Sequence, residues 1–252
     1  MKEALLTFFV FICLTGASLG ALLLHDKLPA HHRHEDTQNV VRLVANIFVV
    51  MTSLVLGLMI NSAKSRFERI NSNVHTLATD LILLDRSLRL YGSDADDARR
   101  RLVLYVARAS DGTWTTGDPV HVSDQTSEQL LNDVGDAVRG LKPADDARLS
   151  IWNDARAQYR RIVEQRWALV EEAEGSIPTP LLCIVIAWLV LIFGSYGYKA
   201  PRNVVVLTTF VLASALISGA LYLIVDMDEP FGGGPIQVSS APLQRAMAEI
   251  KR

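Results

Sequence analysis

Residues Val40–Ile60 read VVRLVANIFVVMTSLVLGLMI, and this stretch decides the fold of the chain. It holds one charged residue, Arg42. A run of about 21 mostly apolar residues has the length that crosses a hydrocarbon core of about 30 Å as a helix. No proline occurs between Val40 and Tyr91, so one long helix is predicted to continue from the membrane into water.

The part of this helix that follows the membrane carries an apolar seam. The seam residues are spaced alternately three and four positions apart: Phe67, Ile70, Val74, Leu77, Leu81, Leu84, Leu88 and Tyr91. This heptad spacing is typical of a helix that packs along other helices. Predicted helices around Leu102, Val134 and Tyr159 can supply those partners, so the seam does not require a coiled coil between subunits.

Composition separates a membrane part from a water-exposed part. The chain has 252 residues and a net charge of −2, but four apolar blocks carry almost no charge. The middle block is balanced in sign and has no basic stripe, which argues against nucleic-acid binding. Cys13 and Cys183 lie in apolar blocks, so buried free thiols are predicted rather than a disulfide.

The fold class that follows is all-α: a polytopic membrane protein with four transmembrane helices and a cytoplasmic helical bundle. The segments are a first transmembrane hairpin (1–60, spans 4–24 and 40–60), the bundle (61–177), a second hairpin (178–226, spans 180–198 and 204–225) and a C-terminal segment (227–252). Gly16xxxGly20 and Ser214xxxSer218 are predicted close-packing faces. Tyr196 and Tyr198 form an aromatic belt where the third span ends.

Four spans place both termini and the bundle on the same side of the membrane. Basic residues concentrate on that side: Lys2, Lys64, Arg66, Arg69, Arg245, Lys251 and Arg252. Loops rich in Lys and Arg stay in the cytoplasm, so the bundle and both termini are predicted to be cytoplasmic.

A polar stripe follows one face of the second span. Its residues, at about 100° per residue, are Arg42, Asn46, Val49, Ser53, Gly57, Ile60, Asn61 and Lys64. Two interpretations stay open. The stripe packs against other helices through small and hydrogen-bonding residues, or it lines a water-filled axis in an oligomer. In the second case Val49 and Ile60 form apolar constrictions, and Arg42 and Lys64 at the two mouths favour anions.

Two clusters are candidates for ligand binding. Residues 25–39 (HDKLPAHHRHEDTQN) contain four histidines: His25, His31, His32 and His34. This segment is a solvated loop, a pH-sensing or headgroup-binding element, or a metal site. Asp226, Asp228 and Glu229 follow the fourth span and precede a glycine-rich turn. They are predicted oxygen ligands of calcium or another divalent cation, or else a plain surface cluster or partners of nearby Arg or Lys.

Three motifs follow one another in a recognisable order: LPAHH at 28–32, VLGL at 55–58 leading to NSAKS at 61–65, and DMDEPF at 226–231 followed by IQVS at 236–239. This order resembles the bestrophin-like, or DUF4239, family of bacterial integral membrane proteins. The tail departs from the family pattern, in which a basic residue is usual before the proline and a triple glycine ending at Gly234 is not.

The resemblance implies kinship with bestrophins, which are oligomeric anion channels gated by calcium at an acidic cluster after a membrane span. The second span would then line the pore, and the three carboxylates from Asp226 to Glu229 would sense the cation. It also implies the inner (plasma) membrane of a bacterium. The expected partners are lipid, inorganic ions and further copies of the chain, in a tetramer or pentamer.

The first hypothesis is therefore an oligomeric ion channel. The alternative is a non-conducting membrane sensor or scaffold that signals through its helical bundle. The sequence has no glycine-rich phosphate loop, no nucleophile elbow and no HExxH motif, so the chain is not expected to be an enzyme.

Overall fold

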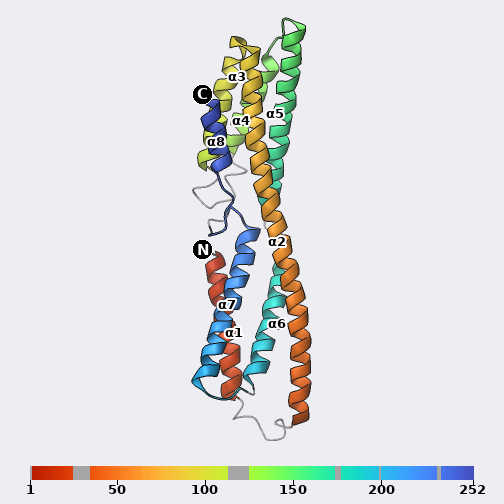
Figure 1. Cartoon of the computed structure of the whole chain (residues 1–252), viewed down its shortest axis with the longest axis vertical. Helices are drawn as coiled ribbons and strands as arrows, with labels where there is room; N and C mark the ends of the chain where they lie inside the picture. Colours follow the sequence, from red (N-terminus) through yellow and green to blue (C-terminus); the bar gives the residue numbers. More distant parts are fainter. Residues whose placement is uncertain (1, 25–34, 113–124, 174–176, 199, 232–233) are drawn as a thin grey trace. The chain divides into compact units, whose positions relative to one another are not determined.

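The computed structural model describes residues 2–24, 35–112, 125–173, 177–198, 200–231 and 234–252, and every regular element within these ranges is a helix (Figure 1). In chain order they are α1 (Lys2–Leu24), α2 (Glu35–Tyr91), the 3-10 helix η3 (Ser93–Ala95), α3 (Asp96–Gly112), α4 (Gln125–Gly140), α5 (Asp146–Ala173), α6 (Thr179–Gly197), α7 (Val204–Asp228) and α8 (Ala241–Ile250). Four helices of the described part are long and apolar enough to cross a membrane: α1, α2, α6 and α7. The predicted all-α class with four spans is confirmed.

The helices form two compact units. The membrane unit comprises Met1–Lys64 and Ser176–Asp228, and the bundle unit comprises Ser65–Gly175 and Glu229–Arg252. Helix α2 contributes its first part to the membrane unit and its second part to the bundle unit. The long helix ends at Gly92, whose φ of 104° is a backbone conformation that L side chains rarely adopt.

The core of the bundle unit forms around the seam of α2. Every seam residue from Ile70 to Tyr91 is buried, and Phe67 is partly buried. Leu102 and Val106 of α3, Val134 of α4 and Ile162 of α5 belong to the same core. The seam therefore has its partners within its own unit, as its spacing predicts.

A buried carboxylate connects α8 to this core. Asp85 Oδ2 lies 2.6 Å from Arg89 Nε, and Asp85 Oδ1 lies 2.9 Å from Arg99 Nε. Arg89 also donates through Nη2 to the backbone carbonyls of Glu249 at 3.2 Å and Ile250 at 2.9 Å. These are among the last carbonyls of α8, which lack partners within the helix. Arg89 thus caps the C-terminal end of α8, and the Asp85 carboxylate pairs with the positive charge of Arg89.

In the membrane unit, α1 packs against both α6 and α7. A close approach joins α1 and α6, where a Cβ on Gly197 would overlap the backbone carbonyl of Ser18. The prediction that Gly16 and Gly20 make such an approach is wrong within the described chain, because a Cβ at either position meets no atom within 4 Å. Ser18, which lies between them in the sequence, makes the close contact instead.

Two further sequence predictions have different outcomes. Ser214 and Ser218 of α7 are buried, as expected for a close-packing face. Both cysteines are free thiols, but Cys13 is only half-buried and Cys183 is exposed. The prediction of buried thiols is therefore wrong, because an apolar span turns only part of its circumference toward its own protein.

Gly197→Ala is expected to lower the free energy of unfolding by about 1–3 kcal/mol, because the added methyl group forces α1 and α6 apart. Gly20→Ala is the matched control, because it adds the same methyl group to a transmembrane helix where space is open. Thermal unfolding of the purified protein in detergent measures both variants. Equal melting of Gly197→Ala and the unmodified protein would contradict the close contact.

Candidate functional site

The membrane part of α2 presents three different faces. The first is packed inside the membrane unit and consists of small or flexible residues: Ala45, Thr52, Met59 and Ala63. They are seven or four positions apart, which places them on one side of a helix. This face holds α2 in the unit.

The second face is the polar stripe. Seven of its eight residues are exposed, and Val49 is half-buried. The stripe is centred about 100° around the helix from the packed face. Within the described chain most of the stripe is left uncovered, although Asn46 accepts a hydrogen bond from a residue of α6, so both interpretations stay open. Its role in lining a pore stays a prediction.

The third face is apolar and exposed. Its residues are Leu43, Ile47, Leu54 and Leu58. Side chains of this type suit contact with lipid acyl chains, whereas the polar residues of the stripe are costly in hydrocarbon. Helix α2 thus has one face for its own protein and one suited to lipid, and a separate polar face remains.

Two side chains of the polar stripe, those of Ser53 and Asn46, make hydrogen bonds within the membrane unit. Ser53 Oγ donates to the carbonyl of Val49 at 2.8 Å, within the helix itself. The hydroxyl of Tyr196, from α6, donates to Asn46 Oδ1 at 3.2 Å. A Cβ on Gly57 would meet no atom within 4 Å, so the stripe has open space at its smallest residue.

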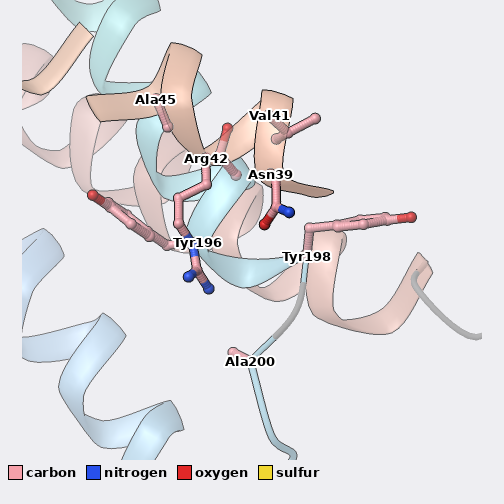
Figure 2. Close-up of a pocket in the computed structure, with 8 residues that line it drawn as sticks. Asn39, Val41, Arg42, Ala45, Tyr196, Tyr198 and Ala200 are labelled. Carbon is pink, nitrogen blue, oxygen red and sulfur yellow. The ribbon is translucent and has the colours of Figure 1, made fainter. Parts of the chain in front are cut away.

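A hollow lies at the Arg42 end of the stripe, between α2 and α6. Its volume is about 350 Å³, and its lining is Asn39, Val41, Arg42, Ala45, Ser195, Tyr196, Tyr198 and Ala200. Figure 2 shows the side chains of Arg42 and Asn39 pointing to the same side, with the two tyrosine rings diverging around them. Sequence reasoning identified Arg42 and the two tyrosines separately. It missed the hollow, because nothing in the sequence pairs residues about 150 positions apart.

The acidic cluster differs from an exposed ligand set. Asp226 and Asp228 are 1% and 4% exposed, whereas Glu229 is exposed. Asp228 Oδ2 accepts a hydrogen bond from the backbone N–H of Ile177 at 3.0 Å, two residues before α6 begins. A carboxylate there satisfies a backbone donor and complements the positive end of the helix dipole. The alternative of a plain surface cluster is therefore wrong for the two aspartates.

No group of three or more His, Cys, Asp or Glu that could hold a metal ion occurs among the residues that the structure describes. The divalent cation at Asp226, Asp228 and Glu229 accordingly stays a prediction. His25, His31, His32 and His34 lie outside the described residues.

Asp228→Ala is expected to lower the free energy of unfolding by about 1–3 kcal/mol, because it leaves the Ile177 N–H without its acceptor. Asp228→Asn keeps an acceptor oxygen and should cost less. Glu229→Ala is the control, since exposed side chains usually change stability by no more than about 0.5 kcal/mol. Thermal unfolding in detergent ranks the three variants. The same loss for Glu229→Ala would show that the Ile177 bond is not the cause.

Comparison with known proteins places this geometry in a family. A model of the bestrophin-like domain matches residues 12–243, which is most of the chain. The chain belongs to the bestrophin-like family. The bestrophin-like resemblance noted in the sequence is thereby confirmed, and the DUF4239 designation is not tested by this match. A search of curated proteins gave no significant match.

Solved structures agree with the family. A crystal structure of a bacterial bestrophin homologue from Klebsiella pneumoniae is 14% identical, with a TM-score of 0.66 over 97% of both chains. A second crystal structure of that homologue is 15% identical, with a TM-score of 0.64 over 96% of both. A structure described as a membrane protein is 14% identical, with a TM-score of 0.66 over 96% of both chains. At these identities the likeness shows the fold alone: an all-helical, bestrophin-like membrane protein.

Proposed function

We propose that this chain is one subunit of a homo-oligomeric, bestrophin-like ion channel whose pore is lined by the polar stripe of α2. The observation that supports the proposal is the exposure of the stripe in the single chain, between a packed face and an apolar face. Polar side chains that face hydrocarbon are unfavourable. A water-filled axis shared by several copies would give the stripe the surroundings it requires.

The chemistry of the stripe favours anions. It contains Arg42 and Lys64 toward its two ends and no carboxylate. Cationic side chains at the mouths raise the local concentration of anions. Val49 and Ile60 separate the polar positions and would act as apolar constrictions that gate by dewetting.

The proposed setting is the inner membrane of a bacterium, with the bundle unit and both termini in the cytoplasm. The basic cluster of Lys64, Arg66 and Arg69, where α2 passes from one unit to the other, supports this orientation. A divalent cation at Asp226, Asp228 and Glu229 would regulate such a channel only if further ligands joined these carboxylates, because Asp228 already accepts a backbone hydrogen bond.

The proposal requires several copies around one axis. We expect the purified protein to have the mass of a tetramer or pentamer in detergent or lipid nanodiscs, measured by light scattering or mass photometry. A stable monomer in both media would rule out a shared axial pore.

Ser53→Leu and Gly57→Leu are expected to reduce single-channel conductance at least several-fold, because each places a large apolar side chain on the polar stripe. Leu54→Phe is the matched control. Leu54 is adjacent in sequence and 61% exposed, but it belongs to the apolar face of α2. Planar-bilayer recordings of the purified protein compare the three variants.

The same recordings test the charge preference. Under a salt gradient the reversal potential of the unmodified channel is expected to lie close to the equilibrium potential of the anion. Currents that Leu54→Phe reduces as much as Ser53→Leu would place the pore elsewhere. Protein that has the mass of the oligomer but carries no current in the bilayer would rule out the channel proposal.

One observation favours a second function. Helix α2 is a single helix of 57 residues that belongs to both units. A continuous helix can transmit a displacement from the membrane to the bundle, as a non-conducting sensor or scaffold requires. A stoichiometric cytoplasmic partner recovered with the protein, together with silent bilayers, would support this alternative.

A further inference from the structure

A cationic side chain, that of Arg42, lines the hollow between α2 and α6. Arg42 is exposed and makes no hydrogen bond or ion pair with any residue that the structure describes. A guanidinium carries five N–H donors in a fork that matches an oxyanion. Among the residues that the structure describes, no carboxylate lines the hollow, and Arg42 gives this described lining a positive charge.

The other polar side chains of the hollow differ in whether their hydrogen-bond donors are already used. Tyr196 uses its hydroxyl proton on Asn46, and Ser195 uses its own on the carbonyl of Leu191 at 2.7 Å. The amide of Asn39, in contrast, has no described partner and points to the same side as Arg42 (Figure 2). Two donor groups without a described partner, one of them charged, thus point to the same side of α2, next to Ser195 and Tyr196, whose hydroxyl protons are already used.

Two carbonyls at the end of α6 already have backbone donors. The carbonyl of Gly194 accepts from the N–H of Tyr198 at 3.0 Å, and that of Gly197 accepts from the N–H of Ala200 at 3.3 Å. These local bonds satisfy two of the carbonyls that a helix C-terminus leaves without partners inside the helix.

The position of the hollow matches the headgroup level of a bilayer. It lies where the apolar sequence of α2 begins and that of α6 ends, beside Tyr196 and Tyr198. Tyrosine is enriched at membrane–water interfaces. Leu191, one turn of α6 before Ser195, is 53% exposed, so an acyl chain can follow that side of α6.

We propose that the α2–α6 hollow binds a phosphate-type anion through the Arg42 guanidinium and the Asn39 amide. Two sources carry this chemistry: the phosphodiester headgroup of an anionic lipid and free inorganic phosphate. Arg42 also belongs to the polar stripe, so an anion bound here would lie at one mouth of the proposed pore. Binding itself requires neither conduction nor a pore, and a non-conducting protein would bind the anion equally well.

The test uses the full-length protein in detergent and native mass spectrometry. The probe is a mixture of phosphatidylglycerol and phosphatidylcholine, and a second series uses inorganic phosphate without lipid. Arg42→Gln is expected to lower the affinity for the anionic probe about tenfold or more, because a charge-assisted, two-pronged contact is lost. The affinity of Arg42→Lys should lie between those of the unmodified protein and Arg42→Gln, since lysine keeps the charge but lacks the planar set of donors of the guanidinium.

Arg202→Gln is the matched control. Arg202 follows α6 in the same unit but lies outside the lining of the hollow, and it donates to the carbonyl of Leu22 at 3.1 Å. A loss for Arg202→Gln as large as that for Arg42→Gln would show a general basic surface and overturn the site. If Arg42→Gln fails to assemble, Asn39→Ala removes the second donor and gives the same comparison.

The two probe series identify the source. An Arg42-dependent preference for phosphatidylglycerol, without phosphate binding, assigns the hollow to a lipid headgroup. Arg42-dependent phosphate binding without a lipid preference assigns it to a free anion. Unchanged binding of both probes by Arg42→Gln and Asn39→Ala overturns the proposal. None of these measurements depends on current, so they stay separable from the bilayer recordings.

Discussion

A helix that crosses a bilayer must satisfy its backbone polar groups within itself. This constraint governs α2, which runs without a break from Glu35 to Tyr91. Because the backbone is satisfied everywhere, only the side chains decide what each face contacts. In the membrane unit α2 has three faces: one packed against its own protein, one apolar and exposed, and the polar stripe. In the bundle unit the same helix places its heptad seam in the core.

Several charged side chains have structural roles in the fold. Asp85 holds two arginines, and one of them caps α8. Asp228 satisfies a backbone donor just before α6. Removing one partner of such a buried contact costs much more than an exposed ion pair contributes. A carboxylate with this structural role is less available to a diffusible cation, so a cation at the acidic cluster would need further ligands.

The fold is shared with bacterial bestrophin homologues at only 14–15% identity. Such a likeness is physically reasonable, since the length of an apolar span and the period of a seam can be kept while nearly every residue changes. Fold alone does not determine function. The channel proposal therefore depends on the exposed stripe of this chain and not on the family name.

The sequence by itself determined the helices and much of their packing. Span length, the seam from Phe67 to Tyr91 and the break at Gly92 were all predictable, because periodicity and hydropathy act locally along the chain. The stripe was also predictable as a pattern. The tertiary structure decided that the stripe is exposed, that Gly197 rather than Gly16 or Gly20 makes the close approach, and that Asp228 is buried. It also brought Arg42 beside Tyr196. These features depend on which helices become neighbours, and that choice is made by packing between segments far apart in the chain.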